Sequence, residues 1–164
     1  AWWPSRIPAG TSTTEMATSM DLLPTIAHLA GATVPSDRII DGKNISHLLE
    51  GDPNGKSPHD VFFYYFRGQL KAVRSGPWKL HVSPPRKQNA TAKPAARMLF
   101  RLDQDVAEER NIIAEHPDVV ARLETLIEAA REDLGDDLSD AKGAGTREPG
   151  FVEEAVTLTS DAEN

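Results

Sequence analysis

The sequence predicts an α+β fold in its second half, with four antiparallel strands covered by one long helix. Four short segments rich in β-branched and aromatic residues lie between residues 61 and 102, and turn residues separate them. A strongly amphipathic segment follows at residues 117–134, with apolar residues three or four positions apart. Because the apolar face of a sheet needs a second layer to cover it, we expect this helix to pack on the sheet.

The length and composition fit one modest globular core. The chain has 164 residues, of which 39% are hydrophobic and 26% charged. Its net charge of -7 argues against a nucleic-acid partner, which would need a basic face. No apolar run reaches the roughly 18 residues of a membrane span, so we expect no membrane partner. The sequence has no cysteine, which excludes disulfides, thiolate metal sites and cysteine nucleophiles within it.

Residues 1–58 do not complete the predicted sheet. We expect strands near residues 1–3 and 14–19, followed by a helix over residues 21–30 with Asp21 as its N-cap. This helix is only about three turns long, so it needs tertiary packing to be stable. The apolar residues that share one of its faces are Leu22, Leu23, Ile26, Leu29 and Ala30.

The strands and the long helix have clear boundaries in the sequence. The strands are expected at residues 61–66, 70–75, 78–83 and 98–102, and a basic polar loop precedes the last one. Pro117 occupies the first position of the long helix, and Asp118 lies near the positive end of its dipole. The buried stripe is expected to comprise Val119, Leu123, Leu126, Ile127, Ala130 and Leu134. Residues 135–164 are acidic and poor in large apolar side chains, which predicts a mostly irregular tail.

The residues alone point to no catalytic site. The phosphate-binding, dinucleotide-binding, zinc-protease and nucleophile-elbow motifs are absent, and the five histidines have no metal-ligand spacing. We therefore assign no catalytic residue and no metal ligand to this chain. Lys79 and His81 alternate with apolar residues on one predicted strand, so together they could bind a sulfate, phosphate or carboxylate. A solvated strand face is the alternative interpretation.

Five segments of the chain, taken in order, carry a family resemblance. They are WWPSRIPAG, MDLLPTIAHLAGATVPSDRIIDGKNISHLLEG, HDVFFYYFRGQLKAVRSGPWKLH, LFRLDQDVAEERNI and HPDVVARLETLIEAA. The ordered set resembles the C-terminal part of the type I, formylglycine-dependent sulfatases, and especially the arylsulfatase A and N-acetylgalactosamine-6-sulfatase branch. No single segment is decisive, but unrelated folds have no reason to repeat all five.

The resemblance implies an alkaline-phosphatase-like α/β fold that is incomplete in this chain. Residues 1–58 would be the last segments of the large sulfatase domain. Residues 59–134 would be the C-terminal subdomain, in which a four-stranded antiparallel sheet carries one long helix. Residues 135–164 would form the acidic tail.

The family hydrolyses sulfate esters with a formylglycine nucleophile and a calcium ion, and the resemblance implies both for the complete enzyme. Neither is expected from this chain. The nearest match to the precursor motif C/S-x-P-x-R, at residues 83–87, ends in lysine, and the calcium ligands belong upstream of residue 1. The C-terminal subdomain borders the active-site cleft in the family. The resemblance therefore implies that Lys79 and His81, together with Arg74, contact the substrate.

We therefore expect a C-terminal fragment of a sulfatase that acts on sulfated glycans or aryl sulfates. It would be inactive alone and completed by its missing N-terminal catalytic portion. The resemblance also implies export to the periplasm, the lysosome or the cell exterior. A second interpretation stays open, a non-catalytic module that binds sulfated glycans through the cations of residues 70–97. A third is a truncated product with no function, which would expose apolar surface and aggregate.

Overall fold

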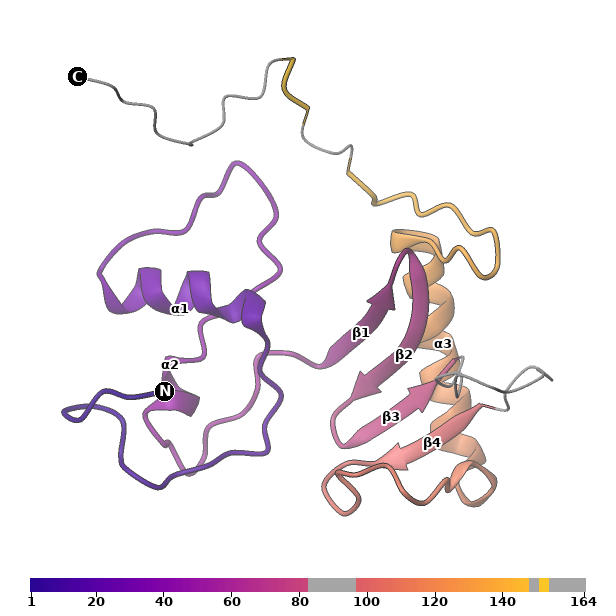
Figure 1. Cartoon of the computed structure of the whole chain (residues 1–164), viewed down its shortest axis with the longest axis horizontal. Helices are drawn as coiled ribbons and strands as arrows, with labels where there is room; N and C mark the ends of the chain where they lie inside the picture. Colours follow the sequence, from indigo (N-terminus) through magenta and orange to yellow (C-terminus); the bar gives the residue numbers. More distant parts are fainter. Residues whose placement is uncertain (83–96, 148–150, 154–164) are drawn as a thin grey trace, which may run out of the picture.

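The structure is a computed structural model that describes residues 1–82, 97–147 and 151–153. Figure 1 shows two parts, which we call the N-terminal part (residues 1–58) and the sheet part (residues 59–147). The N-terminal part contains short helices joined by irregular segments. The sheet part is a four-stranded sheet with one long helix against one of its faces.

The sheet is the antiparallel meander that the sequence predicts, with strand order β1-β2-β3-β4. The strands span Val61–Phe66 (β1), Gln69–Ser75 (β2), Trp78–His81 (β3) and Met98–Arg101 (β4). Two-residue turns join the first three strands. In the first turn, Arg67 and Gly68 both have positive φ, 50° and 70°, as a type I′ hairpin requires. Turns this short keep each strand beside the next.

The long helix α3 spans Pro117–Leu134 and begins with the proline expected at its first position. Its buried stripe packs on the sheet, and the fully or nearly fully buried residues of this core are Leu70, Val73, Leu80, Leu99, Leu123, Ile127 and Ala130. The predicted stripe is confirmed except at its end, because Leu134 is 42% exposed. A short 3-10 helix, Ile113–Glu115, precedes α3 and contacts β4.

The turn that follows α3 is joined to the first hairpin of the sheet. The Tyr65 hydroxyl donates to the carbonyl oxygen of Gly135 at 2.8 Å. Asp136 is fully buried, and its carboxylate accepts the backbone N–H of Leu70 and the Nε–H of Arg131, each at 3.1 Å. These contacts make the start of the predicted tail part of the sheet's packing, although its acidic composition predicted an irregular segment.

The N-terminal part contains a 3-10 helix (Ser19–Asp21), α1 (Leu22–Leu29) and α2 (Ser46–Leu49). The prediction of strands near residues 1–3 and 14–19 is wrong, because these segments are irregular or 3-10 helical. Within the described residues they have no neighbouring strand, and the strand preference of a polar Thr/Ser run is weak without a partner. The carboxylate of Asp21 also does not cap α1. It serves a different purpose, described below.

Candidate functional site

Lys79 and His81 lie on the sheet face that points away from α3. Leu80, between them, is fully buried beneath α3, and side chains alternate between the faces along a strand. Both contact one carboxylate, that of Glu108. Lys79 Nζ lies 2.6 Å from Oε1, and His81 Nε2 lies 2.7 Å from Oε2. Lys79 Nζ also lies 4.7 Å from the centroid of the Tyr64 ring, a cation–π distance.

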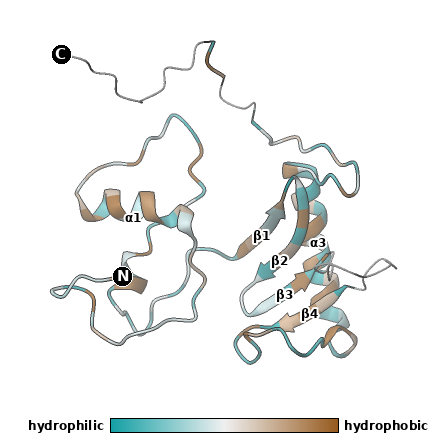
Figure 2. Ribbon diagram, in the orientation of Figure 1, coloured by the Kyte–Doolittle hydropathy of each residue, from teal (hydrophilic) through white to brown (hydrophobic). Residues whose placement is uncertain are grey.

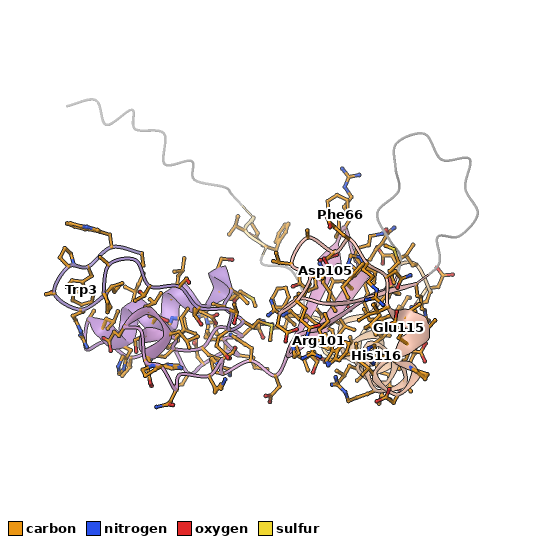
Figure 3. All side chains as sticks on the ribbon, turned by 90° about the horizontal axis from the view of Figure 1, so that it is seen from below. Trp3, Phe66, Arg101, Asp105, Glu115 and His116 are labelled. Atoms are coloured by element: carbon orange, nitrogen blue, oxygen red, sulfur yellow. The ribbon has the colours of Figure 1, made fainter. Side chains whose placement is uncertain are left out.

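The loop that follows β4 positions Glu108. The carboxylate of Asp105, labelled in Figure 3, accepts the backbone N–H groups of Glu109 and Arg110 at 3.0 Å each. These bonds, that from Arg110 first, hold the pKa of Asp105 below its usual value. Within the turn, Glu108 adopts a φ of 56°, which is uncommon for a residue with a Cβ. The loop therefore accepts a strained backbone where Glu108 reaches over β3.

The charges of this cluster balance internally. Burial alone would raise the pKa of Glu108, but the hydrogen bonds from Lys79 and His81 outweigh burial and hold the pKa below its usual value. The side chains of Lys79, His81 and Glu108 are only 15%, 13% and 25% exposed. A sulfate group that approaches Lys79 and His81 would have to compete with a carboxylate that is already held there.

Arg74 is on the same sheet face but does not join this cluster. It is directly opposite Lys79 in the pairing of β2 with β3. Its Nε–H donates to the carbonyl oxygen of Gly76 at 3.0 Å. Arg74 lines an open groove of about 580 Å³ between the N-terminal part and the sheet part, whereas neither Lys79 nor His81 does.

Both signs of charge line this groove. Its ionisable residues are Glu15, Lys56, His59, Asp60, Arg74 and Asp103. Glu15 accepts the backbone N–H of Ser57 at 2.8 Å and binds Lys56 Nζ at 3.1 Å, and these hydrogen bonds, in that order, lower its pKa. Lys56 is therefore paired with Glu15. Arg74 has no ion-pair partner among the residues that the structure describes, so it is the groove cation best placed to meet an anionic ligand.

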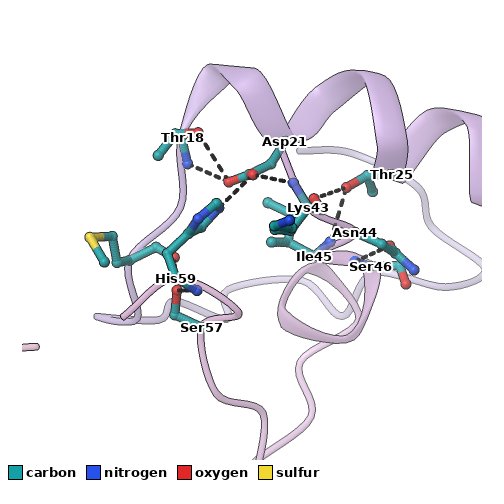
Figure 4. Close-up of polar contacts among 10 residues, drawn as sticks. Thr18, Asp21, Thr25, Lys43, Asn44, Ile45, Ser46, Ser57 and His59 are labelled. Atoms are coloured by element: carbon teal, nitrogen blue, oxygen red, sulfur yellow. Dashed lines mark hydrogen bonds and ion pairs between the residues drawn. The ribbon is translucent and has the colours of Figure 1, made fainter. Parts of the chain in front are cut away.

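A buried polar cluster around Asp21 ties the N-terminal part to the segment just before β1 (Figure 4). The carboxylate accepts the backbone N–H groups of Thr18 at 2.7 Å and Lys43 at 2.8 Å, and it lies 2.6 Å from His59 Nε2. Burial opposes ionisation of Asp21, but these three partners keep its pKa below the usual value.

This cluster does not form a serine nucleophile system. Ser57 lies close to His59, but its hydroxyl donates to a backbone carbonyl at 2.6 Å and accepts the backbone N–H of His59 at 3.1 Å. A catalytic serine would instead donate to the imidazole. The Asp21–His59 pair is therefore structural, and it fixes the segment that leads into β1.

The described residues also limit what this chain could bind by itself. No three His, Asp or Glu side chains gather among them as a metal ion would require, so the implied calcium does not fit this part of the chain. No helix among them is long and apolar enough to cross a membrane. The serine-type motif at residues 83–87 and most of the basic loop up to residue 97 lie outside the described residues.

Comparisons with known proteins agree with this architecture. The family model for the C-terminal region of aryl-sulfatase matches residues 57–144. An arylsulfatase of Hemicentrotus pulcherrimus is 49% identical over 86 residues, which cover 52% of this chain and 15% of that protein. Arylsulfatase A of Bos taurus is 39% identical over 132 residues, which cover 69% of this chain and 25% of that protein. The chain thus spans about a quarter or less of the length of these relatives.

The fold has solved counterparts as well. The PsFucS1 sulfatase from Pseudoalteromonas sp. superposes with a TM-score of 0.61 at 23% identity, over 78% of this chain and 28% of that one. This likeness confirms the predicted alkaline-phosphatase-like sulfatase fold, of which the chain contains a part. The match over residues 57–144 covers more than half of the sequence. The chain therefore belongs to the sulfatase family, whose C-terminal region it represents.

Proposed function

We propose that the chain is the C-terminal region of a sulfuric ester hydrolase and that it is inactive without the catalytic portion of that enzyme. The family match over residues 57–144 is the observation that carries this proposal. When bound, calcium and formylglycine would supply the electrophilic assistance and the nucleophile of ester hydrolysis. The sequence has no cysteine, its nearest serine-type match at residues 83–87 ends in lysine, and the described residues gather no cluster of three acidic or histidine side chains. We therefore assign both groups to the remainder of the enzyme.

The proposal extends to the division of the chain. Residues 1–58 would complete the large α/β domain, residues 59–134 would form the subdomain beside the substrate, and residues 135–164 would be a tail. The groove between the N-terminal part and the sheet part supports this division, because substrate sites often lie where two domains meet. The relatives' family also implies that the enzyme is exported.

Arg74 is the predicted substrate-binding residue that the geometry supports best. It lines the groove and has no ion-pair partner among the described residues. Lys79 and His81 remain candidates, but they could contact an anionic substrate only if Glu108 released them. We propose a sulfated glycan or an aryl sulfate as the substrate.

A non-catalytic module that binds sulfated glycans is supported less well. Such a module needs a continuous cationic surface, and the chain carries a net charge of -7. Lys79 is paired with Glu108, and Lys56 with Glu15. The described residues thus offer Arg74 rather than a cationic patch.

Hydrolysis of p-nitrophenyl sulfate tests the proposal. We expect no turnover by residues 1–164 alone, and turnover by the polypeptide read from the coding sequence extended upstream of Ala1. In that longer polypeptide, Arg74→Ala should raise KM about tenfold with little change in kcat, because a charge-assisted hydrogen bond to the sulfate is lost. Arg110→Ala is the matched control, since Arg110 is exposed and pairs with Glu115 away from the groove.

One result would contradict the proposal, and another would remove only its assignment of Arg74. Turnover by the chain alone that a chelator abolishes would show that the chain needs no further portion. An unchanged KM for Arg74→Ala would remove Arg74 from the substrate site and leave the family assignment intact.

A further inference from the structure

The groove between the N-terminal part and the sheet part contains two unpaired charges of opposite sign. Of the six ionisable residues that line it, four are paired with another side chain. The pairs are Glu15–Lys56 at 3.1 Å, His59–Asp21 at 2.6 Å and Asp103–Arg101 at 3.0 Å. The other two, Asp60 and Arg74, have no ion-pair partner within the part of the chain that the structure describes. A ligand in the groove would therefore meet one unpaired anion and one unpaired cation.

Asp60 and Arg74 are neighbours across the first two strands. Asp60 directly precedes Val61, the first residue of β1. Ser75, which follows Arg74 on β2, is the partner of Val61 in the strand pairing. Diagonal neighbours across two antiparallel strands are about 7–8 Å apart, a separation that one sulfated sugar can bridge. Figure 2 shows hydrophilic residues where the chain enters β1 and at the end of β2, on the side of the sheet part that faces the N-terminal part.

The charge of Arg74 reaches across the groove to the N-terminal part. Two hydrogen bonds, from the backbone N–H of Ser57 and then from Lys56, hold the pKa of Glu15 below its usual value. The charge of Arg74 lowers this pKa further, so its guanidinium and the Glu15 carboxylate lie near each other. The Nε–H of Arg74 donates to the carbonyl oxygen of Gly76 at 3.0 Å. This bond holds the guanidinium at the groove while its charge stays available to a ligand.

One anion beside one cation is complementary to a sulfate ester that carries a hydrogen-bond donor. A guanidinium binds a sulfate group through charge-assisted hydrogen bonds. An ionised carboxylate only accepts hydrogen bonds, so it suits a hydroxyl or amino group of the ligand and is repelled by a second anion. Asp60 is exposed, and its side chain has no hydrogen-bond partner among the described residues, so a ligand can reach it.

We propose that Asp60 is a specificity-determining residue of the sulfatase. It accepts a hydrogen bond from a hydroxyl or amino group beside the sulfate of the substrate, and it repels a second anion at that place. The substrate class is then a monosulfated sugar with a donor group next to its sulfate, rather than a polysulfated chain. This inference rests on the proposed function, because it uses Arg74 as the residue that binds the sulfate.

Three phenyl sulfates that differ only in the charge of one substituent test this assignment. They are meta-carboxyphenyl sulfate, meta-carbamoylphenyl sulfate and meta-(aminomethyl)phenyl sulfate, with a negative, a neutral and a positive substituent. The longer polypeptide that begins upstream of Ala1 is assayed as the parent and as Asp60→Asn. The ionic strength is about 10 mM, at which the screening length is about 30 Å. The measured quantity is kcat/KM for the positive ester divided by that for the negative ester. The intrinsic reactivity of each ester cancels when this ratio is compared between the parent and the variant.

We expect the ratio to fall about tenfold in Asp60→Asn. At the separation given above, a unit charge changes the binding of a charged group in water by roughly threefold, and the change has opposite directions for the two esters. The value of kcat/KM for the neutral ester should stay within about twofold of the parent, because asparagine keeps an oxygen that accepts a hydrogen bond.

The matched control is Glu109→Gln. It removes the same charge at an exposed residue of the sheet part that does not line the groove. The ratio should stay within about twofold of the parent in this variant, because the charge of Glu109 lies outside the groove.

Two outcomes would overturn the role of Asp60. One is an unchanged ratio in Asp60→Asn. The other is an equal fall of the ratio in Glu109→Gln, because the effect would then come from the net charge of the protein rather than from the groove.

The variant Arg74→Ala, assayed with the same three esters, separates this failure from that of the proposed function. If Arg74→Ala raises KM and Asp60→Asn leaves the ratio unchanged, only the role of Asp60 is wrong. If Arg74→Ala leaves KM unchanged, the groove is not the substrate site, and the roles of both residues are overturned. If the longer polypeptide hydrolyses none of the esters, the proposed function is overturned together with this inference.

Discussion

Replacing Asp136 tests whether the turn after α3 is part of the core of the sheet part. The carboxylate is fully buried and accepts the backbone N–H groups of Leu70 and Leu138 and the Nε–H of Arg131, all at 3.1 Å. In Asp136→Ala, the buried Leu70 amide loses its acceptor, which costs about 1–3 kcal/mol. The Leu138 amide lies nearer to solvent and can bond to water, so the loss of its acceptor costs only about 0.5–1 kcal/mol of stability.

Arg131 is not left unpaired in this variant, because its Nη1 also binds Glu128 at 2.8 Å. We therefore expect Asp136→Ala to lower the free energy of unfolding by about 3 kcal/mol. Asp136→Asn keeps an oxygen for both amides but turns an NH2 group toward Arg131, so it loses the hydrogen bond and the ion pair to that residue, which Glu128 still binds. We expect a smaller loss, of about 1 kcal/mol.

Urea denaturation followed by far-UV circular dichroism, which reports on α3, measures both losses. With a slope of about 2 kcal/mol per molar urea for a protein of this size, the midpoints should fall by roughly 1.5 M for alanine and 0.5 M for asparagine. Asp137→Asn is the control, because the side chain of Asp137 is exposed. Equal midpoints for Asp136→Ala and the control would refute the reasoning and show that the turn separates from the sheet at little cost.

Two further predictions concern the other polar clusters. The pKa of Glu108 is lower in the folded chain than in the unfolded one, so its contribution to stability is present above the unfolded pKa of about 4.3 and is lost as the pH falls through the folded value. The melting midpoint of Glu108→Gln should therefore be lower than that of the parent at pH 7, and it should fall less than that of the parent between pH 7 and pH 3. If the two midpoints fall in parallel over this range, the carboxylate is not held by Lys79 and His81. Thr25→Val removes the acceptor of the buried Ile45 N–H and should lower the free energy of unfolding by about 1–2 kcal/mol in urea, whereas Thr11→Val, at an exposed position, should not; identical losses would place Thr25 outside the packed structure.

The strands and α3 could be predicted from the sequence because their determinants are local. Each of the first three strands pairs with its neighbour through a two-residue turn, so alternation and turn residues suffice to define them. The stripe on α3 follows from its 3.6-residue period. The strands predicted at residues 1–3 and 14–19 did not form for a non-local reason. Strand formation there would need a partner, and none is present among the described residues.

The candidate site was predictable only in part for a related reason. The alternation along β3 places Lys79 and His81 on one face, whatever the rest of the chain does. Glu108 reaches these two side chains from a loop position 27 residues after His81, with a positive φ. No local sequence pattern predicts either feature. The partners Asp21 and His59 are 38 residues apart and were hidden in the same way. Residues 103–110 are rich in charge, but a solvated linker has the same composition, so this run did not single out Glu108.

The bond from Leu70 to Asp136 has a consequence for how the protein is made. It joins residues 66 positions apart, so all four strands and the whole of α3 emerge from the ribosome before the acceptor does. Until then, the amide of Leu70 must stay hydrated or unpaired, and the strand that carries it cannot close against the helix at full stability. The Asp136 backbone N–H in turn donates to Ala141, at 2.9 Å. A nascent chain therefore completes this folding unit only after residue 141 has left the exit tunnel, well past the end of its last helix.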